Sequence, residues 1–457
     1  MNPSNLESQE LSDPAPIMRI ALLIIAIITF WVGYILVFEV KCIYGVPEVA
    51  AFRKFGFSDI FGMMDFGKYK RFSPVGFGLW GYLDIHFLVP ILGKAGAADA
   101  ILAEANRLLW VHLAFLGLLC ASSAFVSWRL FQHSIVTTLV VLLVGLNDAI
   151  PFQFRFASTV LCYQLQIATL FTIYFVVVRE RTWVTFFGAA GCIAFILLTW
   201  EQGLNLAIAT SAYLGILILR QFREKGVFPR WDVFLFMSIA LMMTIYLVAR
   251  VQGGTEESLS SNNEASFFFS YKNPFLMFDD LLLNFSALVE QSIRQIFPFP
   301  FESFSVLLGK DMNQFNPYNL SYSQFPNMPY RMMGLWFSGL SFSLFWVFLA
   351  ATIYSTRKSG RENAALLLLC IFGFGFALHL PVMHRDYFYI PGYAVGYKVS
   401  VSYVGFVFMI GLLAERVNWH AAVRILGFRP VSLVYGYVIA AAILRAIALT
   451  QPQRFPW

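Results

Sequence analysis

Several charged residues of this chain lie beside hydrophobic segments and could take part in acid–base or phosphate chemistry. Glu39 follows directly on the first hydrophobic segment, and Asp59, Asp65 and Arg71 lie in the loop beyond it. A carboxylate at a membrane surface can act as a general base on an acceptor hydroxyl, and a nearby arginine can hold a phosphate that leaves. Because polar residues are also common at bilayer edges as anchors and helix caps, a structural interpretation stands beside the chemical one.

Other charges fall in short turns or inside a hydrophobic segment. Asp148 and Arg155 belong to one turn, where the two side chains can simply pair with each other. Glu201 belongs to another turn, and a hairpin needs a few polar residues there for structural reasons alone. Lys398 is harder to explain structurally, since an unpaired ammonium inside a membrane span costs about 2.5–3.5 kcal/mol. We therefore expect Lys398 to face a cavity or a carboxylate.

The composition indicates an integral membrane protein. Of 457 residues, 59% are hydrophobic and only 13% are charged, whereas soluble domains are about 45–50% apolar. Windows of about 20 mostly uncharged residues can cross the bilayer as helices. The sequence predicts an all-α membrane protein, a single polytopic domain over residues 1–457, with eleven transmembrane spans at 18–38, 108–130, 134–147, 157–178, 183–200, 203–219, 232–251, 334–355, 364–381, 389–414 and 431–448.

The orientation of the chain follows from its basic residues, because Lys and Arg in short loops resist translocation. With a cytoplasmic N-terminus, the cytoplasmic connections hold thirteen of them: Arg129, Arg179, Arg181, Arg220, Arg223, Lys225, Arg230, Arg357, Lys358, Arg361, Arg416, Arg424 and Arg429. We therefore expect the N-terminus inside and the C-terminus outside, in the plasma (inner) membrane if the source is bacterial.

This topology leaves two long outer segments, residues 39–107 and 252–333. Aromatic and aliphatic residues recur in Gly76–Leu92 and Phe275–Phe297, a pattern that favours helices lying along the membrane interface. Gly253–Asn263 is small and polar, which is typical of a mobile loop. We expect both segments to cap the bundle, the second containing a candidate substrate lid.

Familiar soluble chemistries are not indicated. The chain has no GxxxxGK[ST] or GxGxxG nucleotide-binding motif, and four of its five cysteines lie inside predicted spans, which leaves neither a disulfide framework nor a CxxC metal site. No nucleic-acid partner is expected. Any reaction must therefore use a substrate that arrives already activated.

Three local patterns stand out, Phe57–Tyr82, Glu201–Gly203 and Arg385–Gly392. Together they resemble motifs of the GT-C superfamily of polytopic glycosyltransferases, in particular its O-mannosyltransferase-like branch. Phe57–Tyr82 looks like the acidic-aromatic first loop that precedes an Arg-x-Pro-aliphatic motif. Glu201–Gly203 is similar to a Lys-Glu motif at the start of a helix, and Arg385–Gly392 resembles an Arg-Tyr-x-Tyr-x-Pro motif. The resemblance covers most of the chain as architecture but only a small part as specific sequence.

The resemblance implies a transfer of sugar from a polyprenyl-phosphate donor to an acceptor hydroxyl at the non-cytoplasmic face, by one in-line displacement with inversion. Glu39, or else Asp59 or Asp65, would be the catalytic base. The residues implied in substrate binding are Arg71, Asp148, Glu201, Arg385, Tyr387 and Lys398, of which the cations would neutralise the departing phosphate. A divalent metal is optional and no other cofactor is expected; the partners are the lipid-linked donor, membrane lipids and other membrane proteins.

The sequence also departs from that family. Its usual base is an aspartate, often one of an acidic pair, whereas Glu39 stands alone; Trp200 replaces the lysine before Glu201, and only Asp148 represents the second acidic site. Two interpretations are therefore compatible with the sequence: a divergent transferase with a relocated base, and a protein of GT-C-like architecture that no longer catalyses the reaction. Two further interpretations are a lipid or small-solute transporter or flippase, against which the lack of internal repeats speaks, and a non-catalytic subunit of a membrane assembly.

Overall fold

The computed structural model describes residues 14–37, 100–147, 150, 154, 160–200, 202–253, 285, 288–289, 292, 343, 346–347, 349–354, 361–377 and 399–417. The regular structure of these residues is entirely helical. The elements are α2 (Pro14–Val37), α7 (Ala100–Phe131), α8 (Ser134–Gly145), α10 (Val160–Ile173) with its π-helical continuation η2 (Tyr174–Val178), α11 (Trp183–Thr199), α12 (Gly203–Lys225), α13 (Arg230–Gly253), α18 (Glu362–Phe374) and α20 (Ser400–Ala414).

Within the described part of the chain, five helical stretches are long and apolar enough to cross a membrane. They are Ile17–Leu36, Leu108–Phe131, Val160–Val178, Gly203–Lys225 and Arg230–Val248, and four shorter apolar helices (α8, α11, α18 and α20) accompany them. The all-helical character and the membrane character predicted from composition are confirmed at this level. Expected span 334–355 is described only in part, and 431–448 lies outside the described residues.

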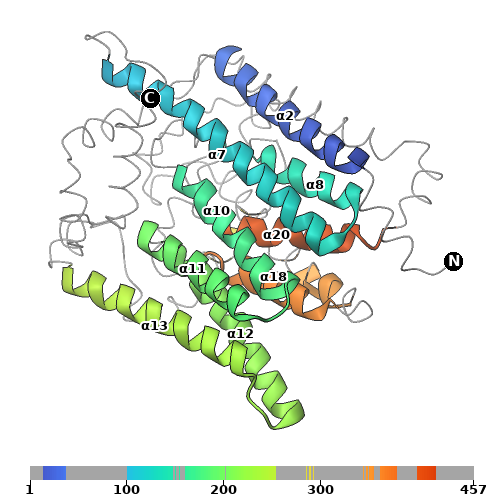
Figure 1. Cartoon of the computed structure of the whole chain (residues 1–457), viewed down its shortest axis with the longest axis vertical. Coiled ribbons are helices and arrows are strands. Elements are labelled where there is room, and N and C mark those ends of the chain that lie inside the picture. The colour runs from blue at the N-terminus through green and yellow to red at the C-terminus, as the bar shows by residue number, and fades with distance from the viewer. Residues whose placement is uncertain are drawn as a thin grey trace, which may run out of the picture.

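Helix α10 occupies the middle of the described bundle. It packs against α7, α11, α18 and α20, and twelve of its fourteen residues are buried. Figure 1 shows α10 between α2 along one edge of the molecule and α13 along the opposite edge. Only 22% of the apolar window of each edge helix is buried. Because helices that are apolar all round need either protein or lipid on every face, we infer that α2 and α13 border the lipid.

The threonine side chains of α10 are compatible with this central position because their hydroxyls donate to backbone carbonyls of the same helix. The Thr169 hydroxyl donates to the Leu165 carbonyl at 2.7 Å, and the Thr172 hydroxyl donates to the Ala168 carbonyl at 2.8 Å. Such bonds to the preceding turn let threonine lie in an apolar environment without a partner on another helix.

Helices α18 and α20 approach closely through a glycine. A Cβ atom added at Gly405 of α20 would lie 2.7 Å from the Phe372 nitrogen and 3.0 Å from the Leu368 carbonyl oxygen. The Ser402 hydroxyl donates to the Phe372 carbonyl across the same contact at 2.7 Å. Small residues that bring backbones together are a common basis of helix association in membranes.

We expect Gly405→Ala to destabilise the protein by about 1–3 kcal/mol, because a methyl group forced into a packed contact displaces its neighbours. Gly373→Ala on α18 is the matched control, since no atom lies within 4 Å of the Cβ position there; it should be neutral or slightly stabilising. Thermal unfolding in detergent micelles would measure both. Equal melting temperatures for the two variants would contradict the close α18–α20 contact.

Helix α7 is longer than the sequence predicted. It begins at Ala100 rather than near residue 108, so that residues 100–107, expected at the end of the first outer segment, are helical. The segment Ala100–Arg107 contains three alanines, and alanine favours the helix intrinsically. The polar residues Glu104, Asn106 and Arg107 limited the predicted membrane span at residue 108, but the helix continues through them.

Four described residues beyond the end of α13 belong to the second outer segment, and two of them contact residues at the end of α18 and the start of α20. Leu288 and Val289 are fully buried, and the Phe285 ring packs edge-on against Phe376 with centroids 5.5 Å apart. The Ser292 hydroxyl donates to the Ser402 hydroxyl at 3.1 Å. Phe285 and Ser292 therefore contact protein at the end of α18 and the start of α20, and Leu288 and Val289 between them are buried.

Candidate functional site

One end of the bundle gathers basic residues, and we call it the basic end. Its contacts join segments far apart in sequence: Arg181 pairs with Asp232 at 2.5 Å, Arg220 with Glu362 at 2.9 Å, and Arg361 with Glu415 at 2.9 Å. Nine of the thirteen residues predicted to lie in cytoplasmic connections are described, and all nine belong to helix ends or turns here: Arg129, Arg179, Arg181, Arg220, Arg223, Lys225, Arg230, Arg361 and Arg416.

The other end of the bundle contains a cluster of aromatic side chains, and we call it the aromatic end. The Trp31 indole of α2 donates to the Gly145 carbonyl of α8 at 2.7 Å and packs against Phe154 with ring centroids 5.6 Å apart. His112 of α7 contacts both Phe154 and Tyr163 of α10 edge-on, at 5.9 and 5.8 Å. Phe154, in the connection between α8 and α10, thus contacts α2 and α7, and His112 joins this cluster to α10.

Three residues near this end have buried polar atoms without a hydrogen-bond partner. They are the Tyr163 hydroxyl, both amide atoms of Gln164, and the amide oxygen of Gln202, and all three residues are almost fully buried. A buried polar atom that makes no protein contact is costly, so in folded proteins it usually bonds to water or a ligand. These side chains are therefore candidate contacts for a polar molecule that enters the bundle at the aromatic end.

Sequence reasoning missed Tyr163 and Gln164. The signal was present, because uncharged amide and phenol side chains stand at consecutive positions in an otherwise apolar span. Gln202 was part of the predicted motif only as the neighbour of Glu201. The third member of that motif, Gly203, has a structural role: a Cβ atom there would lie 2.7 Å from the Ile196 carbonyl, so glycine lets the turn lie on the end of α11.

The predicted site residues lie outside the described part of the chain and stay predictions: Glu39, Asp59, Asp65, Arg71, Asp148, Glu201, Arg385, Tyr387 and Lys398. Four of them adjoin described helix ends in the sequence, with Glu39 after α2, Asp148 after α8, Glu201 before α12 and Lys398 before α20.

Those four helix ends lie at the same end of the bundle. The Tyr403 hydroxyl at the start of α20 donates to the Leu143 carbonyl near the end of α8 at 2.5 Å, and Trp31 near the end of α2 contacts Gly145. Helix α12 starts beside the end of α11, which runs antiparallel to α10 from the basic end. The described structure thus places the helix termini that adjoin these four sequence-predicted residues at one end of the bundle.

At the basic end, an ion pair with a buried carboxylate attaches α13 to the turn before α11. The Arg181 guanidinium pairs with Asp232, whose side chain is fully buried, while Arg181 retains about a third of its exposure. Arg181 also lies over the Trp231 ring at 5.5 Å, and the Trp231 indole donates to the Thr182 carbonyl at 3.0 Å. Thr182 caps α11 through a reciprocal hydrogen-bond pair with Thr185, which fixes the turn that carries Arg181.

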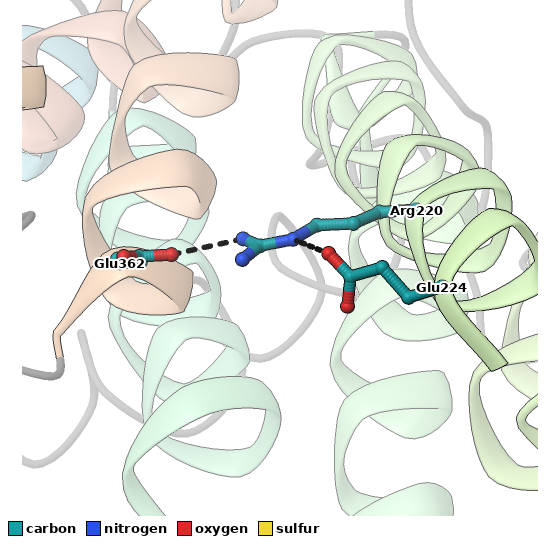
Figure 2. A network of polar contacts seen from close by, with 3 residues as sticks. All are labelled: Arg220, Glu224 and Glu362. Atoms are coloured by element: carbon teal, nitrogen blue, oxygen red, sulfur yellow. Dashed lines mark hydrogen bonds and ion pairs between the residues drawn. The ribbon is translucent and has the colours of Figure 1, made fainter.

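A second ionic contact joins α12 to α18 at the surface. Figure 2 shows the Arg220 guanidinium between Glu224, one turn further along α12, and Glu362 in the first turn of α18. Both distances are 2.9 Å, and all three side chains are about half exposed. Exposed pairs of this kind contribute only about 0–1 kcal/mol each. The network therefore shows that the end of α12 and the start of α18 are adjacent, but it contributes little to the stability of the fold.

The third ionic contact joins α18, α20 and the end of α7. Arg361, before α18, pairs with Glu415 at 2.9 Å and donates to the Leu130 carbonyl. Burial raises the pKa of the Glu415 carboxyl, against the opposing effect of Arg361, Arg416 and His133. Because burial outweighs the three neighbouring basic groups, the charged form of Glu415 is less favoured in the folded protein than in the unfolded chain.

The raised pKa of Glu415 predicts a pH dependence of stability. A carboxyl whose pKa is higher in the folded state binds protons more tightly there, so the free energy of unfolding falls as the pH rises from about 4.5 through the folded-state pKa. We expect Glu415→Gln, which resembles the protonated form, to weaken this decline. Thermal unfolding between pH 4.5 and 8 would measure it; a steeper decline in the variant than in the wild type would contradict the prediction.

Comparisons with known proteins do not identify a family: no family model, no curated protein and no solved structure matches this chain.

Proposed function

We propose that the protein is a divergent GT-C-type glycosyltransferase, which moves a sugar from a polyprenyl-phosphate donor to an acceptor hydroxyl at the non-cytoplasmic face with inversion. The observation that supports this most is the position of the helix termini next to Glu39, Asp148, Glu201 and Lys398. All four helix termini lie at the aromatic end, away from the basic end. A site assembled from distant motifs needs such a gathering of helix ends.

The membrane topology is part of the proposal. Eleven transmembrane helices, with the N-terminus and the basic end in the cytoplasm, would turn the aromatic end to the other side of the membrane. The nine basic residues gathered at one end of the described bundle support this orientation, since Lys and Arg are retained on the cytoplasmic side. The lipid-linked donor would then keep its polyprenyl chain in the bilayer while its sugar reaches the aromatic end.

The proposed chemistry divides roles between carboxylates and cations. Glu39 deprotonates the acceptor hydroxyl, with Asp59 or Asp65 as the alternative base. The hydroxyl oxygen attacks the anomeric carbon and the bond from that carbon to the phosphate oxygen breaks. Arg71 and Arg385 stabilise the negative charge that develops on the departing polyprenyl phosphate.

A transporter or flippase is the second candidate, and one observation favours it. The unpartnered Tyr163 hydroxyl and Gln164 amide lie inside the bundle on its central helix. Buried polar groups of this kind also suit a translocation pathway for a polar headgroup.

An assay in proteoliposomes separates the two functions. Purified protein would be supplied with polyprenyl-phosphate donors that carry radiolabelled sugars, together with a panel of hydroxyl acceptors. A transferase produces a labelled acceptor and free polyprenyl phosphate in equal amounts. A flippase moves the intact donor between leaflets and leaves its sugar–phosphate bond unbroken. If no labelled acceptor is formed and the donor does not move between leaflets, the transferase is refuted. The remaining interpretation is then a non-catalytic subunit.

A further inference from the structure

Two arginines at the basic end lie on a pair of aromatic rings in contact with each other. The Arg129 guanidinium of α7 is 5.7 Å from the centroid of Phe125, and the Arg179 guanidinium after η2 is 5.7 Å from the centroid of Tyr174. The Phe125 and Tyr174 rings are themselves 5.1 Å apart, centroid to centroid. We call these four residues the arginine platform. Cation–π contacts hold both guanidinium groups close to the same surface.

The two arginines are not neutralised by the described residues. Arg181, Arg220 and Arg361 each pair with a carboxylate, whereas neither Arg129 nor Arg179 forms an ion pair within the described part of the chain. Glu180, the nearest acidic residue in sequence to Arg179, makes no ion pair with either. Both arginine side chains are exposed. The platform therefore presents two positive charges to whatever surrounds the protein at this level.

The surroundings of the platform are those of a membrane interface. Trp183, four residues after Arg179, is 65% exposed, and tryptophan favours the headgroup level of the bilayer. Phe125 is 40% exposed on the side of α7 that carries Arg129. Phe171 lies next to Phe125, with centroids 6.5 Å apart, and stacks on Phe175. An apolar surface thus continues from the platform over Phe171 and Phe175, where α10 passes into η2.

We propose that the arginine platform binds an anionic phospholipid of the same leaflet, such as phosphatidylglycerol. The two guanidinium groups donate charge-assisted hydrogen bonds to the phosphate, and one acyl chain lies on Phe125, Phe171 and Phe175. Two uncompensated positive charges favour a headgroup with net negative charge over a zwitterionic one. This site is at the opposite end of the bundle from the proposed catalytic site and does not depend on the transferase assignment.

The π-helical turn η2 contributes to the geometry of the site. It ends α10 with Tyr174–Val178, and the Arg179 nitrogen donates to the Tyr174 carbonyl at 3.1 Å. The wider turn thus ties Arg179 to the residue whose ring lies beneath its guanidinium. Single π-helical turns occur frequently at functional sites, and here the turn places Arg179 beside the ring pair that also supports Arg129.

Native mass spectrometry of the intact protein in detergent, titrated with phosphatidylglycerol or phosphatidylcholine, tests the proposal. The wild type should retain a first phosphatidylglycerol in preference to phosphatidylcholine. In the double variant Arg129→Gln/Arg179→Gln, the apparent dissociation constant for this first lipid should rise about 25-fold, because each arginine near an anionic lipid surface contributes roughly five-fold. The double variant Arg129→Lys/Arg179→Lys, which keeps the charge but not the planar fork, should lose less affinity.

The matched control is Arg223→Gln/Arg230→Gln, which removes two exposed charges from the same end of the bundle but away from the platform. Its first phosphatidylglycerol should bind nearly as in the wild type. Equal loss in the two glutamine variants would overturn a specific site, as would retention of the lipid by Arg129→Gln/Arg179→Gln. Displacement of the lipid by inorganic phosphate would show that the site recognises phosphate alone, and would refute a phospholipid site. Thermal unfolding in phosphatidylcholine confirms that each variant is folded.

Discussion

Glu39→Gln should lower the rate of sugar transfer by about 10²–10⁴, the usual contribution of a general base. Glutamine keeps the size and most of the hydrogen bonding of glutamate but cannot accept the proton of the acceptor hydroxyl. Glu39 follows the end of α2, an apolar helix that reaches the aromatic end of the bundle. We expect folding and membrane insertion to remain nearly normal, because the change affects one side chain beyond the helix.

The same proteoliposome assay, with equal amounts of each protein, would measure this effect. Asp59→Asn and Asp65→Asn are the controls, because both residues are alternative bases in the same segment of the chain. Full activity of Glu39→Gln together with loss of activity in Asp65→Asn would show that the general base is Asp65 and not Glu39. If none of the three changes affects a protein that is active in the assay, the proposed acid–base mechanism is wrong.

Arg181→Met should destabilise the fold by about 3–5 kcal/mol, the usual effect of removing one partner of a buried ion pair. The loss is large because the Asp232 side chain is fully buried and its other carboxylate oxygen has no hydrogen-bond partner. Methionine fills much of the space of the arginine stem but leaves the carboxylate without a counter-charge. Thermal or denaturant-induced unfolding in micelles would measure the change.

A double-variant cycle makes this prediction specific. Asp232→Leu combined with Arg181→Met should recover most of the lost stability, since replacing both members of a buried ion pair by apolar residues is often neutral. Arg220→Gln is the surface control, and it should cost no more than about 1 kcal/mol because its two glutamate partners are half exposed. A cost for Arg181→Met as small as that for Arg220→Gln would show that the buried ion pair does not stabilise the fold.

The sequence alone predicted the helices well, since nine expected spans overlap described helices. Hydrophobic length is a strong signal because a lipid-exposed backbone must satisfy its own hydrogen bonds, which within one segment only a helix does. Boundaries were less certain where local propensity continues beyond the apolar window. The start of α7 at Ala100 is such a case, as is the end of α12 at Lys225, six residues beyond its predicted span.

The positions of the charged residues were only partly predictable. The rule for basic residues assigned Arg181, Arg220 and Arg361 to one side of the membrane, and the structure places them at one end of the bundle. Their individual partners were not predictable, because Asp232, Glu362 and Glu415 are separated from them by between 51 and 142 residues. Pairing over such distances depends on how the helices pack, which no local pattern specifies.

Composition and hydrophobic length were enough to predict a helical membrane protein and the positions of many of its helices, and the charged motifs gave the candidates for chemistry. Three features became visible only once the helices were packed: Phe154 and His112 join α2, α7 and α10, the Tyr163 and Gln164 side chains are buried without hydrogen-bond partners, and Arg129 and Arg179 lie over two rings in contact. The physical reason is the range of the interactions. Helix formation and membrane insertion depend on neighbouring residues, whereas burial, ring contacts and shared charge arise between helices that are brought together only by folding.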